Sequence, residues 1–189
     1  MGTDVRRRIL AATLDLIGEH GISGLSNRLV AKNARVSLGA VTYHFSSQDE
    51  LLSEALSIFV NDEIERLSGI ISALEGTTLT LDEALALTRS AIEERPGRRA
   101  QIAQLDLYVH ATRNSDLREA AARCYAAYDE AGTAMLKSLG VPEPERMAPV
   151  LGALIDGLEL RRLSVDGLSV NLPEALAALI AGLRANSPT

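Results

Sequence analysis

Residues that support disulfide, metal or nucleophilic chemistry are scarce in this sequence. Its 189 residues include a single cysteine, Cys124, so no disulfide can form within the chain and a reducing cytoplasm is expected. The three histidines, His20, His44 and His110, do not have the spacing of a metal site, and no motif of a serine hydrolase, zinc protease or phosphate loop is present. We therefore expect no enzyme activity, no bound metal and no cofactor.

Long apolar runs are also missing, although 47% of the residues are hydrophobic. No stretch is long and uncharged enough to cross a bilayer, so no membrane partner is expected. Three arginines near the N-terminus resemble the charged start of a signal peptide, but Asp15 and Glu19 interrupt the apolar part that follows. The apolar residues of this segment recur at helical spacing, at Val5, Ile9, Ala12 and Leu16. The segment is therefore predicted to be an amphipathic helix.

Strand-like alternation is absent, and alanine and leucine recur at 3.6-residue spacing, so the sequence predicts an all-α fold. Capping residues at helix starts, and glycine and proline at helix ends, divide the chain into about nine helices. Two S/T-x-x-E capping boxes, Ser47–Glu50 and Thr80–Glu83, mark two of the starts. The expected helices are 3–20, 26–34, 37–44, 47–74, 80–95, 98–112, 114–140, 142–163 and 173–185.

The chain is expected to divide near Ser46 into two domains with different tasks. Residues 1–46 form a compact three-helix head, and residues 47–189 form a larger helical body. The long helix 47–74 joins them without a Gly/Ser linker. Because a continuous helix can transmit rotation, this connection favours communication between the head and the body.

Charge is distributed unevenly along the chain, whose formal net charge is −6. Residues 5–45 contain six basic and two acidic residues, whereas residues 61–189 contain 13 basic and 19 acidic residues. A basic N-terminal segment would attract phosphate groups. Segregated charge is also common on ordinary solvated surfaces, so this pattern alone does not establish nucleic-acid binding.

The segment 26–45, SNRLVAKNARVSLGAVTYHF, is the most informative part of the chain. It predicts two short helices around a tight turn, with Ser37 as the N-cap of the second helix and Val41 facing inward. A short second helix of this kind fits the major groove of DNA, which makes DNA binding the leading interpretation. The alternative is a helical pair that packs within a protein and contacts no DNA.

Five spaced elements within residues 8–56 together resemble the TetR-type transcriptional repressors. They are E-H-G at 19–21, R-x-x-A at 28–31, V-S-x-G at 36–39, Y-H-F at 43–45 and S-x-x-E-L-L at 47–52. The resemblance implies a homodimer that binds a near-palindromic operator, with a small molecule in the body that moves the two heads out of register. Two-fold symmetry would place the half-site centres about 34–36 Å apart, or a multiple of that distance.

The resemblance also implies roles for individual residues of the head. Contacts to base edges or to the nearby backbone are implied for Leu38, Gly39, Thr42 and Tyr43. Contacts to phosphates are implied for Ser37, Tyr43 and His44 in the second helix of the motif, and for Ser26 and Arg28 at the start of the first. Helix N-termini favour anions, which agrees with the phosphate contacts implied for Ser26 and Arg28.

Three positions depart from the usual family pattern. Leu38 stands where lysine is frequent, which removes a cationic contact and leaves an apolar one for a thymine methyl group. Gln48 also stands where lysine is frequent, and Arg35 stands where a turn glycine is usual. If Arg35 has a positive φ, the strain is about 1 kcal/mol. These departures bear on affinity and on operator sequence.

Candidate ligand-binding residues in the body gather around three of the four tyrosines. Tyr125 and Tyr128 are three positions apart and therefore neighbours on one helical face. The candidates for a cavity wall with polar anchors are Tyr108, Thr112, Arg113, Tyr125 and Tyr128. The alternative is that each is an ordinary core or surface residue.

Two aliphatic stripes near the C-terminus are candidates for an isologous four-helix dimer interface. The predicted interface residues are Leu151, Leu154, Ile155 and Leu158 on one helix, and Leu176, Leu179, Ile180 and Leu183 on the next. The alternative is that both stripes belong to the core of a single chain.

These patterns predict a ligand-responsive, homodimeric, cytoplasmic DNA-binding regulator. We expect it to repress nearby genes and to leave a palindromic operator when a small molecule binds. The alternative is an all-helical small-molecule-binding or adaptor protein that does not bind DNA. The net acidity and the missing basic residues at positions 38 and 48 favour that alternative, whereas the spaced head motif favours the regulator.

Overall fold

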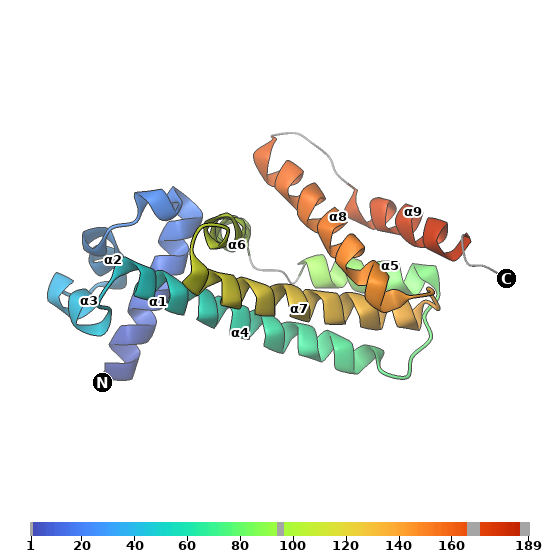
Figure 1. The fold of residues 1–189 in the computed structure, drawn as a ribbon, viewed down its shortest axis with the longest axis horizontal. Helices are drawn as coiled ribbons and strands as arrows, with labels where there is room; N and C mark the ends of the chain where they lie inside the picture. The colour runs from blue at the N-terminus through green and yellow to red at the C-terminus, as the bar shows by residue number, and fades with distance from the viewer. Residues whose placement is uncertain (1, 94–96, 166–170, 186–189) are drawn as a thin grey trace. The chain divides into compact units, whose positions relative to one another are not determined.

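The computed structural model describes residues 2–93, 97–165 and 171–185, which form nine α-helices, one 3₁₀ turn and no strand (Figure 1). The predicted all-α fold is thereby confirmed. The elements are α1 (Gly2–His20), η1 (Ile22–Gly24), α2 (Asn27–Ala34), α3 (Leu38–His44), α4 (Gln48–Leu74), α5 (Leu81–Glu93), α6 (Arg98–Ala111), α7 (Ser115–Ser138), α8 (Pro144–Ser164) and α9 (Leu172–Ala185). The turn expected at residues 166 and 167 lies outside the described residues.

The chain folds as two compact units, each assembled from two separate stretches. The first unit comprises Met1–Glu63 and Pro96–Cys124, and the second comprises Ile64–Arg95 and Tyr125–Thr189. Two of the boundaries between them fall inside helices, after Glu63 in α4 and after Cys124 in α7. Both helices therefore continue from one unit into the other. The functional division expected near Ser46 remains a prediction.

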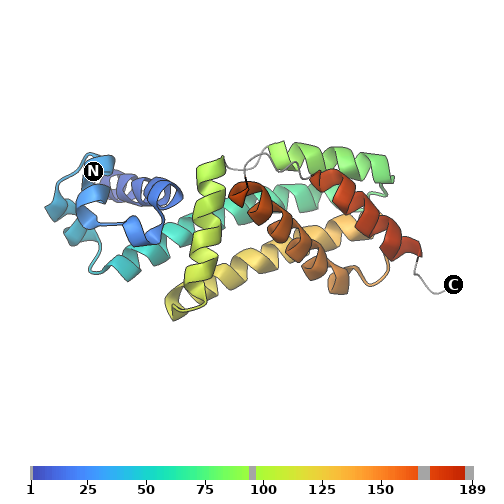
Figure 2. The same ribbon diagram turned by 90° about the horizontal axis from the view of Figure 1, so that it is seen from above.

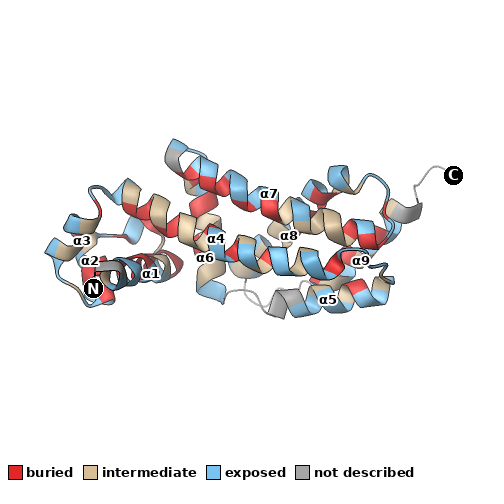
Figure 3. Ribbon diagram, turned by 90° about the horizontal axis from the view of Figure 1, so that it is seen from below, coloured by how far each residue is buried: buried red, intermediate tan, exposed pale blue. Residues whose placement is uncertain are grey.

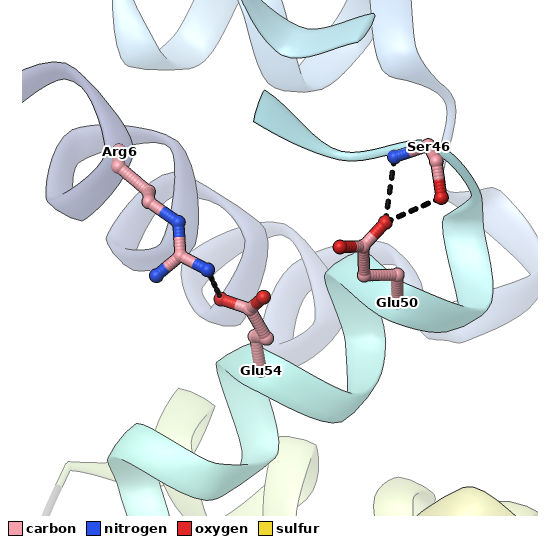
Figure 4. A network of polar contacts seen from close by, with 4 residues as sticks. All are labelled: Arg6, Ser46, Glu50 and Glu54. Atoms are coloured by element: carbon pink, nitrogen blue, oxygen red, sulfur yellow. Dashed lines mark hydrogen bonds and ion pairs between the residues drawn. The ribbon is translucent and has the colours of Figure 1, made fainter. Parts of the chain in front are cut away.

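A complete capping box begins α5, as the sequence indicates, and one half of the predicted box begins α4. Thr80 Oγ1 accepts a hydrogen bond from Glu83 N at 3.3 Å, and the Glu83 carboxylate accepts one from Thr80 N at 2.8 Å. At α4, Ser47 Oγ accepts from Glu50 N at 3.0 Å. The Glu50 carboxylate reaches one residue further back, to Ser46 N at 2.7 Å and Ser46 Oγ at 2.6 Å (Figure 4). The hydrogen bonds from Ser46 lower the pKa of Glu50, and those from Thr80 lower the pKa of Glu83.

The core of the first unit forms where α1 packs against α2, α3 and α6. Its largest buried side chains include Ile9, Ile17, Val30, Val41, Leu51, Leu56 and Leu107. Two contacts hold α6 to the N-terminal helices (Figure 2). Gly18 of α1 lies against the backbone of Arg99, and the Asp106 carboxylate accepts a hydrogen bond from Ile22 N at 2.6 Å. Helix α6 therefore helps to hold the N-terminal helices in place.

The core of the second unit lies between α5, the C-terminal part of α7, α8 and α9. Helix α9 packs against both α5 and α8 (Figures 1 and 2). The buried cluster consists of Ala84, Leu136, Leu139, Val141, Ala148, Leu151, Leu172, Leu176 and Ile180. Helices α7 and α8 approach closely, since a Cβ at Gly132 would lie 3.3 Å from the Ala148 Cβ.

The described helices have buried and exposed faces, as amphipathic helices of a globular protein do (Figure 3). None of these helices is both long and apolar enough to cross a membrane.

Candidate functional site

The candidate nucleic-acid interface begins with helix α2 and the turn that follows it. Ser26 Oγ caps α2 by accepting a hydrogen bond from Leu29 N at 3.3 Å. Arg35 ends the helix in the left-handed region, with φ 55° and ψ 48°. Its N–H and that of Val36 bond back to the carbonyls of Lys32 and Ala31, which closes a Schellman turn. The turn thus has the backbone geometry that favours glycine, although arginine occupies it.

Helix α3 is anchored by one face and leaves the other open. Ser37 Oγ caps it by accepting from Ala40 N at 3.1 Å. Val41 and the C-cap residue Phe45 are buried. Gly39 and Tyr43 fall on the side of the helix opposite Val41, because each residue turns the helix by about 100°, whereas Leu38 and Thr42 lie between these two sides. Leu38 is 42% exposed and Tyr43 is 85% exposed.

The predicted DNA-binding residues lie on α2, on α3 and at their N-caps, two helices that pack against each other and carry exposed residues (Figure 3). Seven of them are exposed, namely Ser26, Arg28, Ser37, Leu38, Gly39, Thr42 and Tyr43, and His44 is partly buried. We refer to these eight residues as the α2–α3 face. Their role in DNA binding remains a prediction.

Gly39 and Tyr43 are hard to explain by the packing of this chain alone. A Cβ at Gly39 would meet only Ser37 Oγ, at 3.8 Å, which is an ordinary contact. Glycine is therefore not required there by the fold, but it leaves room for another molecule to approach the backbone. The Tyr43 ring is held edge-on to His44, with 5.2 Å between ring centroids, and extends into solvent. An exposed, oriented phenol is suited to contacting a phosphate or a base.

Two of the three N-terminal arginines have partners within the first unit. Arg6 forms an ion pair with Glu54 of α4 (Figure 4) and lies 5.4 Å above the Phe45 ring. Arg8 donates a hydrogen bond to the Arg35 carbonyl oxygen at 3.2 Å. Arg6 thus supports the end of α3, and Arg8 supports the turn before it, so both help to position the α2–α3 face.

The second unit contains a cavity of about 330 Å³ between α4, α5, α7, α8 and α9. Most of its wall is apolar, including Leu67, Ile70, Met135, Leu151, Ile155 and Leu176. Its polar and aromatic lining consists of Arg66, Thr88, Tyr125, Tyr128, Asp129 and Asp156. An apolar cavity of this size with a few polar groups is typical of a small-molecule site.

The cavity includes only part of the ligand-binding set expected from the sequence. Tyr125 and Tyr128 of α7 line it. Tyr108, Thr112 and Arg113 belong to α6 and the turn after it, in the first unit, and are not among the lining residues. Tyr108 is instead buried, and its hydroxyl accepts a hydrogen bond from Gln104 Nε2 at 2.8 Å. The carboxylates of Asp129 and Asp156 were missed, because helical spacing alone does not bring residues of α7 and α8 together.

The predicted dimer residues lie in the core region of the single chain. Leu151, Leu176 and Ile180 are buried in the core cluster of the second unit. The other five, Leu154, Ile155, Leu158, Leu179 and Leu183, are partly buried and pack against it. One chain therefore already covers most of both stripes.

A different face of α8 is apolar and exposed. Val150 is 49% exposed and Leu160 is 51% exposed, and the small residues Ala153 and Gly157 lie exposed between them. These four residues recur at helical spacing on one side of the helix, and we refer to them as the α8 outer face. Ala178, Ala181 and Gly182 of α9 are exposed as well. The sequence shows these small residues, but the longer leucine stripes dominate the pattern.

Comparisons with known proteins cover both units. A family model described as bacterial regulatory proteins of the tetR family matches residues 9–55. A second model, described as the tetracyclin repressor-like C-terminal domain, matches residues 75–185. Within the described residues, no group of three or more His, Cys, Asp or Glu side chains is placed to hold a metal ion.

Individual relatives agree with these matches. The chain is 42% identical to the HTH-type transcriptional regulator PksA of Bacillus subtilis over 65 residues, which is 34% of this chain and 32% of that protein. The solved regulator SCO7518 of Streptomyces coelicolor A3(2) is 30% identical, with a TM-score of 0.68 over 95% of this chain and 97% of that one. The multidrug binding protein EbrR, solved with imidazole, is 30% identical, with a TM-score of 0.69 over 94% and 93% of the two chains. The chain therefore belongs to the TetR family of helix-turn-helix transcriptional regulators.

Proposed function

We propose that this TetR-family regulator works as a homodimer that represses nearby genes and leaves a palindromic operator when a small molecule occupies the cavity of the second unit. The DNA-binding part of this proposal rests on the exposure of the α2–α3 face. Tyr43, Gly39 and Leu38 are exposed there, while Val41 and Phe45 are buried and anchor the same helix.

Contacts on the α2–α3 face divide into two classes. Arg28 near the N-terminus of α2 would hold phosphates together with the capping serines Ser26 and Ser37, because helix N-termini favour anions. Leu38 and Thr42 occupy the side of α3 that would face the base edges. Phosphate contacts fix the position of the protein, and base contacts select the sequence.

Pairing of two copies is proposed through α8 and α9. The α8 outer face, formed by Val150, Ala153, Gly157 and Leu160, is apolar and exposed, and small residues allow two helices to approach closely. The partly buried leucines of the predicted stripes would form the margin of the same interface. In a two-fold interface each copy contributes the same patch, so one apolar face is sufficient.

An effector role is proposed for the cavity. The similar multidrug binding protein EbrR has been solved with imidazole and with ethidium. In this chain Arg66 and Tyr125 line the cavity on α4 and α7, the two helices that continue into the first unit. A ligand that binds one arrangement of these helices better than another would change operator affinity, with a coupling of about 1–3 kcal/mol.

The direct test is DNase footprinting on the DNA upstream of the gene that encodes this chain. We expect protection of a palindrome whose half-site centres are about 34–36 Å apart, or a multiple of that distance. Affinity should fall steeply as salt is raised, because phosphate contacts release counterions. Arg28→Ala should weaken binding to all sequences alike and flatten this salt dependence. Absence of any protected site at low salt would contradict the proposal.

A further inference from the structure

One carboxylate in the cavity of the second unit has no partner among the residues that the structure describes. Asp129 of α7 is partly buried and lines the cavity. Within the described parts of the chain, no group makes a hydrogen bond or an ion pair with its side chain. Partial burial raises the pKa of Asp129, because it removes some of the water around the charged form. A buried charge is costly unless it is paired, so this group is suited to receive a positive charge from outside the chain.

Gly152 of α8 leaves space beside the carboxylate of Asp129. A Cβ at Gly152 of α8 would lie 3.8 Å from Asp129 Oδ1, so the carboxylate oxygen lies beside a position without a side chain. Both residues line the cavity. The space next to the carboxylate is therefore accessible to a molecule inside the cavity.

Two tyrosines of the same helix line the cavity beside Asp129. Tyr125 and Tyr128 precede it by four residues and one residue, and both are lining residues. Tyrosine rings attract cations through the negative face of the ring, and this attraction is stronger when the cation is desolvated. Aromatic rings and an unpaired carboxylate in the same apolar wall both favour a positively charged ligand.

Two other charged groups line the cavity, and they do not reverse this preference. Arg66 of α4 and Asp156 of α8 carry opposite charges, so with Asp129 the lining has a formal net charge of −1. Arg66 and Asp156 each take part in an interaction within the protein, although the buried Nη1 atom of Arg66 makes no hydrogen bond and could donate one to a polar group of the ligand. Asp129 is thus the carboxylate left to balance a ligand.

We infer that the cavity binds a small organic cation, with an apolar or aromatic body against the aliphatic wall and its positive charge beside Asp129. An anion would be repelled by Asp129, and a neutral ligand would remove water from the carboxylate without pairing it. This inference rests on the effector role proposed for the cavity, because it names the chemical class of that effector.

The test compares two probes of the same shape that differ only in charge. Phenyltrimethylammonium carries a permanent positive charge, and tert-butylbenzene has carbon in place of the nitrogen. Binding to the full-length protein without DNA is measured by isothermal titration calorimetry. We expect phenyltrimethylammonium to bind and tert-butylbenzene to bind about tenfold more weakly or worse, since the charge pair in a desolvated site is lost.

Matched variants assign the effect to Asp129. Asp129→Asn keeps the shape and removes the charge, and it should weaken cation binding by about tenfold or more. Glu130→Gln removes the same charge from the next, exposed residue of α7, and binding should not change. Asp129→Glu keeps the charge and should keep most of the affinity. Circular dichroism of each variant shows whether it is folded.

The outcomes separate this inference from the proposed function. Equal binding of both probes, no binding of the cation, or full cation affinity in a folded Asp129→Asn variant would overturn the inference. A footprinted operator complex would still support DNA binding in each of these cases. If the cation binds through Asp129 but does not release the operator, the inference holds and the proposed effector coupling fails.

Discussion

The Arg99 carbonyl group of α6 lies against Gly18 of α1, so closely that a Cβ at position 18 would collide with it. Helix α1 and helix α6 therefore approach each other at a residue without a side chain. Gly18→Ala should destabilise the protein by about 1–3 kcal/mol, because the two backbones must separate to admit a methyl group. Urea unfolding followed by circular dichroism measures this change.

Gly69→Ala is the control for this variant. Gly69 is exposed within α4, and nothing lies within 4 Å of the position that its Cβ would occupy. Alanine there should stabilise the helix by about 0.5–1 kcal/mol. Equal effects of the two substitutions would show that α1 and α6 are not closely packed at Gly18.

Arg35 holds a left-handed conformation with φ 55°, which costs a residue with a side chain about 1–2 kcal/mol. Two substitutions separate this strain from the loss of charge. Arg35→Ala removes the guanidinium and keeps the strain, and Arg35→Gly removes both. The glycine variant should be more stable than the alanine variant by about 1 kcal/mol in urea unfolding. A more stable alanine variant would show that the turn does not need a positive φ.

Tyr43 is 85% exposed, so its substitution should affect DNA binding without affecting the fold. Tyr43→Ala should weaken binding to the footprinted operator by about 1–3 kcal/mol, measured by fluorescence anisotropy. The free energy of unfolding should change by no more than about 0.5 kcal/mol. Tyr43→Phe retains the ring and shows how much of the loss belongs to the hydroxyl. Unchanged affinity in Tyr43→Ala would mean that α3 does not reach the DNA at this residue.

Cation binding in the cavity should depend on pH through Asp129. Burial raises the pKa of this carboxyl, so lowering the pH through that raised pKa protonates the carboxylate and removes its charge. Affinity for phenyltrimethylammonium should therefore be full above this pKa and fall as the pH drops through it. The probe has a permanent charge, so its own charge does not change with pH.

The Asp129→Asn variant isolates this pH dependence, because it retains Asp156, Tyr125 and Tyr128. Its weaker binding should lack the step that titration of Asp129 produces. Calorimetric titrations of both proteins over a pH series make the comparison. An identical step in both proteins would assign the titration to another group.

Gly157 tests the proposed pairing of two copies through the α8 outer face. Gly157→Glu places a charge on that face, and two-fold symmetry would bring the two new charges together, which is repulsive. Analytical ultracentrifugation should show dissociation to monomers, while Gly69→Glu on exposed α4 leaves the assembly unchanged. A Gly157→Glu protein that still forms dimers would place the interface elsewhere.

Local signals in the sequence predicted most helix boundaries and the α2–α3 face. Ser37 caps α3, and the Thr80–Glu83 box forms as expected, because capping involves residues three apart. Gly21 follows α1 as expected, with φ 71° and ψ 167°, a positive-φ conformation that glycine tolerates but that differs from the left-handed helical one. The η1 turn at Ile22–Gly24 was not predicted, since three residues carry too little periodicity.

These local sequence patterns did not predict contacts between residues that are far apart in the chain. Asp106 accepts a hydrogen bond from Ile22 N across 84 positions of the chain, and no pattern near either residue indicates it. Tyr108 was grouped with Tyr125 by composition, but the fold assigns them to different units. The leucine stripe with Leu176 indicated an interface, although in the single chain it packs in the core. Periodicity identifies an apolar face without identifying what covers it.

Each unit is assembled from two separate stretches of the chain, so a truncated fragment of the N-terminal stretch loses part of its own unit. The N-terminal helices share their unit with α6, which follows α5 of the other unit in the chain. A fragment ending near Ser46 would lack Arg99 and Asp106, and with them the surface that covers Gly18 and the bond to Ile22. Such a truncated head would expose the surface of α1 that α6 covers, so operator binding is best studied on the intact chain.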